Sequence, residues 1–303
     1  MDEMTVVREL RAEAPAAGRP ELVSGRERLL REAVRGTRTR RPWASRRLAV
    51  VGAAAAVTAA ALIGTQVMGG PDSAQPGAGP GYTLELGSAK TLLNDAADAI
   101  AARPAVTAHD GQWIYEKTVE TNMTDEDRPG PQTSEDWTKY ANPAMENGQA
   151  GDDHSPREEY EFLKSLPEDP AKVRAKARAF FYATDVSEAR TEHEYRALTV
   201  VLTRAYAYDP QGLAKIYRAL ATIPGVRAAQ VQDVAGRDAI ALYLKGDDPT
   251  ADRQELLLDP STYLYSGFRF VARSDGPDQK KGDIVISGAQ LALAVVDKKG
   301  ERP

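Results

Sequence analysis

Residues 254–272 read QELLLDPSTYLYSGFRFVA, and this stretch indicates how the C-terminal half of the chain folds. Runs of Leu, Tyr, Phe and Val flank a short polar segment, and such residues are typical of strands. Pro260 after Asp259 favours a tight turn, and Tyr263 begins a new extended segment. The stretch therefore predicts two strands, residues 254–258 and 263–272, joined by a turn.

Apolar runs, helix caps and turn residues predict further elements before and after this pair of strands. We expect further strands at residues 112–121, 133–141, 226–234, 239–245 and 284–296. We expect helices at residues 88–102, 169–181, 191–207 and 210–222, the first capped by Ser88 with Leu92, Ala96, Ala99 and Ile100 facing inward. Strands come first and last with helices between them, which predicts an α+β domain at residues 83–303 with a curved, largely antiparallel sheet packed against helices.

An uncharged run at residues 48–68 predicts a transmembrane helix. Its 21 residues would span about 31 Å as a helix, close to the hydrocarbon thickness of a bilayer. A cleaved secretory signal is the alternative, but its basic region would be 47 residues long and its apolar run is too long. A twin-arginine signal at Arg46-Arg47 is also disfavoured, because the residues that follow lack the expected pattern.

Basic residues on one side of this run predict its orientation. They are Arg38, Arg40, Arg41, Arg46 and Arg47, whereas no Lys or Arg follows the run until Lys90. Basic flanks remain in the cytoplasm, so we expect a single-pass protein of the cell membrane with its N-terminus inside and its large domain outside. A Pro- and Gly-rich linker, residues 69–82, would hold that domain away from the membrane.

Charge and cysteine content limit the function classes. Residues 1–47 carry a net charge of +5 and residues 69–303 a net charge of −10. The basic part suits anionic lipid headgroups, and the acidic domain argues against nucleic acid as a partner. The chain has no cysteine, which excludes disulfides, zinc–thiolate sites and thiol catalysis.

The cytoplasmic segment, residues 1–47, has the pattern of two short helices that cannot form a core of their own. The first carries Met4, Val7 and Leu10 on one side, which suggests docking to a partner. The alternatives are helices that lie on the membrane surface and a disordered, solvated basic tail that only sets topology. Small residues spaced by four in the predicted span suggest a homodimer contact through Gly52, Ala56, Ala60 and Gly64, although a run so rich in alanine produces such a stripe easily.

Five segments together resemble an uncharacterised actinobacterial family of single-pass membrane proteins. They are DEMTVVRELRAEAP (2–15), LPEDPAKV (166–173), ALATIPGV (219–226), DVAGRDAIAL (233–242) and ELLLDPSTYLYSG (255–267). Members of this family are often encoded beside extracytoplasmic-function sigma factors. The resemblance also implies an outer domain distantly similar to lipoprotein-carrier and sigma-regulatory sensor folds, and it implies no catalytic residue.

No residue pattern in the chain clearly indicates a catalytic or metal-binding site. The histidines His109, His154 and His193 are far apart in sequence, and Asp152-Asp153-His154 matches no metal-site spacing. The acidic pairs Glu158-Glu159 and Asp247-Asp248 are expected to be solvated loops. We therefore expect no enzyme, no cofactor and no metal.

Aromatic residues on the first two strands suggest the one candidate ligand face. Trp113, Tyr115, Trp137 and Tyr140 could line a hydrophobic cavity for an acyl chain, the alternative being core packing under the helices. The favoured function is a signalling or envelope-sensing protein that regulates a sigma factor through residues 1–47. The alternative is a membrane-tethered lipid- or lipoprotein-binding module without catalytic activity, whose partner would be a hydrophobic ligand or an envelope protein.

Overall fold

A computed structural model describes residues 84–85, 88–122, 130–184, 187–246 and 251–303. All of them belong to the unit Asp72–Pro303. None of the helices in these ranges has the length and apolar character needed to cross a membrane. The predicted span, the arginines before it, the linker, the docking residues Met4, Val7 and Leu10, the stripe Gly52, Ala56, Ala60 and Gly64, and the pair Asp247-Asp248 lie outside the described residues.

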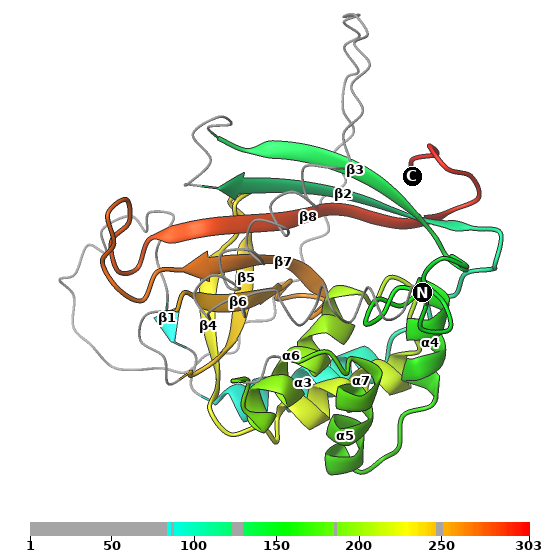
Figure 1. The fold of residues 1–303 in the computed structure, drawn as a ribbon, viewed down its shortest axis with the longest axis horizontal. Coiled ribbons are helices and arrows are strands. Elements are labelled where there is room, and N and C mark those ends of the chain that lie inside the picture. Colours follow the sequence, from blue (N-terminus) through cyan, green and yellow to red (C-terminus); the bar gives the residue numbers. More distant parts are fainter. Residues whose placement is uncertain (1–83, 86–87, 123–129, 185–186, 247–250) are drawn as a thin grey trace, which may run out of the picture. The chain divides into compact units, whose positions relative to one another are not determined.

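The described residues form an α+β domain around one antiparallel sheet of eight strands, in the order β1-β4-β5-β6-β7-β8-β2-β3. The strands are β1 (Leu84–Glu85), β2 (Trp113–Asn122), β3 (Gln132–Lys139), β4 (Val226–Gln232), β5 (Asp238–Leu244), β6 (Arg253–Leu258), β7 (Tyr265–Val271) and β8 (Ile284–Val296). The sheet twists, so β2, β3 and β8 run across the view of Figure 1 while β4 and β5 run steeply. The predicted antiparallel α+β class is confirmed.

The hairpin of β6 and β7 contains residues 254–271, and its turn depends on Asp259. The Asp259 Oδ1 atom accepts hydrogen bonds from the backbone N–H groups of Ser261 (2.9 Å) and Thr262 (2.8 Å). Tyr263 then takes a positive φ of 57°. The second strand therefore begins at Tyr265, two residues later than predicted, because Tyr263 belongs to the turn.

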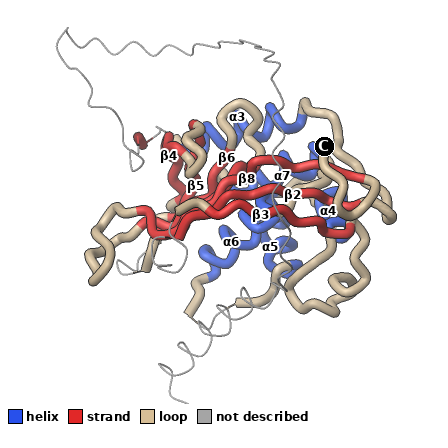
Figure 2. Tube along the Cα trace, turned by 90° about the horizontal axis from the view of Figure 1, so that it is seen from above, coloured by secondary structure: helices blue, strands red, loops and turns tan. Residues whose placement is uncertain are grey.

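Five helices lie in the described ranges, all on one side of the sheet. They are α3 (Ala89–Ala101), α4 (Pro156–Lys164), α5 (Pro170–Phe180), α6 (Arg190–Thr203) and α7 (Pro210–Leu220). Ser88, Ser155, Asp169 and Asp209 cap four of them through side-chain oxygens that accept backbone hydrogen bonds. Figure 1 shows the helices below β7 and β8, and Figure 2, seen from above, shows the strands crossing over them.

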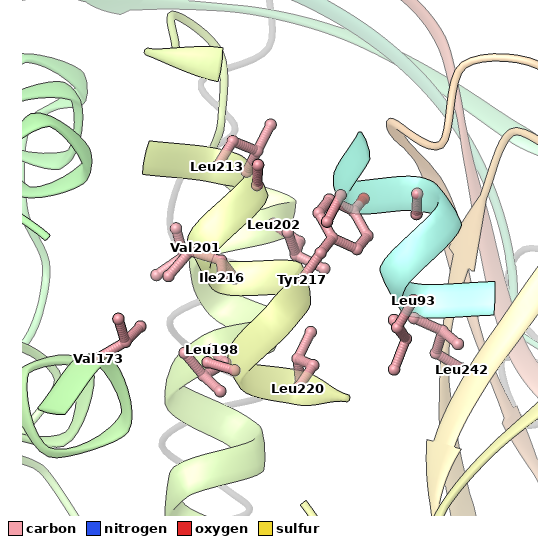
Figure 3. Close-up of a cluster of buried hydrophobic side chains, with 14 of the residues drawn as sticks. Leu93, Val173, Leu198, Val201, Leu202, Leu213, Ile216, Tyr217, Leu220 and Leu242 are labelled. Carbon is pink, nitrogen blue, oxygen red and sulfur yellow. The ribbon is translucent and has the colours of Figure 1, made fainter. Parts of the chain in front are cut away.

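Helix α7 forms the centre of the main hydrophobic core. Its Leu213, Ile216, Tyr217 and Leu220 are all at most 1% exposed. In Figure 3 these side chains lie between the helix that carries Leu93 and the helix that carries Val173. The close approach of α4 to α7 requires Gly212, because a Cβ atom there would stand 2.3 Å from the carbonyl oxygen of Leu163.

Three predictions about the helices were wrong. Helix α3 buries Ala96 and Ile100 as predicted, but it also buries Leu93 and Ala97, whereas Leu92 is only partly buried and Ala99 is exposed, because the helix packs against both α7 and β4. Helix α6 ends at Thr203 and not at residue 207, and the chain after it pairs with the segment that follows α3. Helix α4 was expected to be a solvated loop around Glu158-Glu159, yet Glu159 is 5% exposed and faces the core.

Candidate functional site

A cavity of about 360 Å³ lies between the helices and the sheet. Its lining comes from the chain after α3, the end of α6 and the segment that follows it, helix α7, two hairpin turns, and strands β7 and β8. The lining residues are Arg103, Val106, Leu202, Thr203, Ala205, Tyr206, Tyr208, Leu213, Tyr217, Arg237, Asp259, Thr262, Leu264, Tyr265, Ser266, Gln290, Leu293, Ala294 and Val295. The first and last lining residues, Arg103 and Val295, are therefore more than 190 positions apart in the sequence.

The topology of the sheet explains why these segments meet. Neighbouring antiparallel strands alternate in direction, so the β4–β5 turn and the β6–β7 turn lie at the same end of the sheet. Strand β8 also finishes at that end. The segment after α6 is fixed there by paired backbone hydrogen bonds between Val106 and Tyr208, of 3.1 and 2.8 Å. The cavity is thus built by turns and element ends, held by the sheet.

The apolar part of the cavity includes a leucine that the fold leaves incompletely covered. Leu293 on β8 is 37% exposed, although it lies on the helix-facing side of the sheet with Val295. Val295 packs beside Ile114, which shares a small cluster with Tyr140 and Ala207. Exposed apolar surface inside a concave site is typical of a ligand-binding cavity.

Two tyrosines and a glutamine form a polar part of the same lining. The hydroxyls of Tyr206 and Tyr265 have no hydrogen-bond partner among the described residues, and burial raises the pKa of both. The Gln290 amide donates a hydrogen bond of 2.7 Å to Oε1 of Glu116 on β2. Burial raises the pKa of Glu116 as well, so this side of the cavity resists negative charge.

The arginines of the lining differ in their partners. Arg237 forms an ion pair of 2.7 Å with Asp233 and donates to the backbone oxygen of Ser266 at 3.3 Å. Arg103 donates from Nε to the hydroxyl of Tyr208 at 3.3 Å. No ion pair within the described ranges includes Arg103.

The four aromatic residues predicted as a ligand face are divided between two places. Trp137 lies against Tyr115, with ring centroids 5.2 Å apart. Trp113 is two residues before Tyr115 on β2, so the two side chains point to the same face of the sheet. Ile114 points the other way, toward the helices, so these three residues lie on the face of the sheet opposite the cavity. Tyr140 is buried on the helix side, with Ile114.

The C-terminal segment, residues 297–303, folds back over those three aromatic residues. Arg302 lies 5.7 Å from the ring of Trp137 and forms an ion pair of 2.6 Å with Glu135, while Lys299 lies 5.6 Å from the ring of Trp113. The Trp137 indole N–H donates to the backbone oxygen of Glu301 at 2.6 Å. The outer aromatic face is therefore covered by the chain itself.

Two histidines that are distant in sequence lie near each other in space. His154 stacks on Phe180 at 3.7 Å, and its Nε2 lies 2.9 Å from the Phe180 backbone oxygen; Nε2 of His193 lies 2.7 Å from that of Phe181. Both nitrogens must donate, because a carbonyl oxygen only accepts. His109 is exposed. The described part of the chain contains no cluster of three or more His, Asp or Glu residues placed to hold a metal ion.

Sequence reasoning missed the cavity because its residues come from turns and element ends, where neither helical nor strand periodicity applies. The closest signal was the pair Tyr206 and Tyr208, beside the helix cap Asp209. The chain matches no protein-family model, none of the curated proteins and no solved structure.

Proposed function

We propose that the domain at residues 83–303 binds an amphipathic small molecule in the cavity between sheet and helices. We also propose that residues 48–68 tether this domain to the outer face of a cell membrane. The observation that carries the proposal is the cavity itself, with Leu293 exposed in it. Its volume of about 360 Å³ lies in the range of small-molecule sites, of roughly 300–1,000 Å³.

The chemistry of the lining supports an amphipathic ligand. Leucine, valine and alanine side chains cover one part of the cavity, and the tyrosine hydroxyls, Gln290 and the arginines cover the rest. A molecule with an acyl chain and one polar group would satisfy both parts. The module would act by binding and presenting this molecule, without catalysis.

The test compares two leucines on one strand. Leu291 and Leu293 are 39% and 37% exposed, but only Leu293 is among the cavity-lining residues. The full chain is purified from its native membrane, and bound lipids are extracted and quantified by mass spectrometry. We expect Leu293→Trp to lose most of a ligand that the wild type and Leu291→Trp both retain.

Lipid that surrounds the predicted transmembrane helix contributes equally to all three proteins, so it cancels when their lipid contents are compared. Only the fraction that depends on position 293 counts as cavity ligand. Equal lipid content in the three proteins would overturn the proposal.

We also propose that residues 1–47 dock a cytoplasmic partner, with a sigma factor as the candidate. The proposal depends on the sequence alone, namely the spacing of Met4, Val7 and Leu10 in a basic segment. A pull-down from native lysate with the full chain, compared with Val7→Asp/Leu10→Asp, tests it. Capture of a sigma factor by the wild type only would support regulation; equal capture by both, or none, would count against it.

A further inference from the structure

We infer that Arg103 binds the anionic group, a carboxylate or a phosphate, of the ligand in the cavity between sheet and helices. The inference rests on the proposed binding function and adds the chemical class of the ligand: an apolar chain that ends in one anionic group.

The first observation is the position of Arg103. It lies two residues after the end of α3, is partly buried, and lines the cavity next to Tyr208. The one hydrogen bond of its side chain within the described residues runs from Nε to the Tyr208 hydroxyl, at 3.3 Å. The two terminal nitrogens of the guanidinium group therefore remain available to a ligand.

The second observation is that most other described arginines of the domain have carboxylate partners; Arg227 and Arg273, which do not line this cavity, instead donate to the backbone oxygens of Val226 and Gly246. Arg237, in the same lining, is paired with Asp233 at 2.7 Å, and Arg204, beside the lining, is paired with Asp153 at 2.8 Å. Removing a charge from water is unfavourable unless it is paired, so the partly buried guanidinium group of Arg103 favours an anionic partner. An anionic ligand would supply the missing partner of Arg103.

The acidic residue of the lining does not supply it. Asp259 is held in its own turn, where Oδ1 accepts hydrogen bonds from the N–H and hydroxyl groups of Ser261 and Thr262. Burial opposes ionisation of this carboxyl, but those four hydrogen bonds outweigh it and lower its pKa. The charge of Asp259 is thus satisfied locally.

The shape of the guanidinium group selects the ligand class. Its planar fork of N–H donors matches the paired oxygens of a carboxylate or a phosphate, and a charge-assisted pair is stronger than a neutral hydrogen bond. The Tyr208 hydroxyl holds Nε, which orients the fork. A neutral alcohol or ester of the same chain length would fill the apolar part but leave Arg103 unpaired.

The experiment uses three photoreactive probes with the same diazirine-bearing alkyl chain and different ends: a carboxylic acid, a phosphate monoester and an alcohol. Each is titrated onto the detergent-solubilised full chain and cross-linked, and labelled peptides are identified by mass spectrometry. Labelling of peptides from residues 202–217 and 290–295 reports occupancy of the cavity. The proteins are the wild type, Arg103→Gln, Arg103→Lys and, as a control outside the cavity, Arg218→Gln.

We expect the anionic probes to label the cavity of the wild type at concentrations roughly tenfold to hundredfold lower than the alcohol. Arg103→Gln should remove this difference, Arg103→Lys should retain part of it, and Arg218→Gln should behave as the wild type. A preference for the acid over the phosphate, or the reverse, identifies the source of the anionic group. Thermal unfolding of each variant verifies that it is folded. If Arg103→Gln does not fold, the comparison of the wild type with Arg103→Lys tests the inference.

Two other outcomes separate the inference from the proposed function. Equal labelling of the cavity by acid and alcohol, unchanged in Arg103→Gln, would overturn the role of Arg103 and leave the binding function intact. Absence of labelled cavity peptides with every probe would overturn both.

Discussion

Glu159 on α4 gives a prediction about stability and pH. Its side chain is buried, and Arg204 lies closer to Asp153, at 2.8 Å, than to Glu159, at 3.4 Å. Burial raises the pKa of Glu159 to about 8, because the shared arginine does not compensate for the loss of water around the carboxylate. The folded domain therefore favours the protonated, neutral form of this residue.

The direction of the pH effect on stability follows from the pKa of Glu159 in the folded and the unfolded state. The pKa is higher in the folded state, about 8, than the ordinary value of 4.5, so the contribution of Glu159 to stability is complete below pH 4.5 and is lost as the pH rises toward 8. At about 1.4 kcal/mol for each pH unit between the two values, the loss is about 4 kcal/mol between about pH 5 and about pH 8.5.

Glu159→Gln removes the titration while keeping the shape of the neutral side chain. Urea unfolding of the full chain, followed by tryptophan fluorescence at both pH values, measures the change in the free energy of unfolding. We expect the wild type to lose about 4 kcal/mol more than Glu159→Gln over this interval. Glu161→Gln, an exposed change on the same helix, should retain the pH dependence of the wild type. Coincident pH profiles for the wild type and Glu159→Gln would refute the reasoning.

Two further predictions concern the packing of the domain. Gly212→Ala places a Cβ atom 2.3 Å from the Leu163 carbonyl oxygen and should lower the free energy of unfolding by about 1–3 kcal/mol, measured by thermal unfolding. In the control Gly111→Ala, the added Cβ atom meets no atom within 4 Å, so the free energy of unfolding should change by less than about 0.5 kcal/mol. Equal effects would mean that α4 moves away at no cost. Arg302→Gln removes the ion pair with Glu135 and should change stability by less than about 1 kcal/mol while hydrogen exchange in the C-terminal segment becomes several-fold faster. Unchanged exchange would show that other contacts hold that segment.

Much of the secondary structure was predictable because its causes are local. Asp169-Pro170 and Asp209-Pro210 begin α5 and α7, since an aspartate caps each helix and proline suits its first position. The turn at Asp259 likewise depends on its own neighbours. The start of the second strand was predicted two residues too early, at Tyr263 instead of Tyr265, because the positive φ of Tyr263 has no sequence signal.

Helix α4 shows where local reasoning fails. Ser155 and Pro156 are ordinary start signals, but two adjacent glutamates indicated a solvated loop. The structure buries one of them, because α4 packs against α7 with Phe162 and Leu163 on the same side. Whether a carboxylate is buried depends on which element lies opposite, and the sequence around it does not specify that.

By itself, the sequence determined the α+β class, the order of nearly all helices and strands and the absence of disulfides, because these follow from caps, turns, periodicity and composition. Only the tertiary structure decided which face of the sheet the helices cover. That choice placed Trp113, Tyr115 and Trp137 under the C-terminal segment and formed the cavity of Arg103 and Leu293 on the other face. The reason is that a cavity is made by contacts between segments far apart in the chain, and neither propensity nor spacing reports on such contacts.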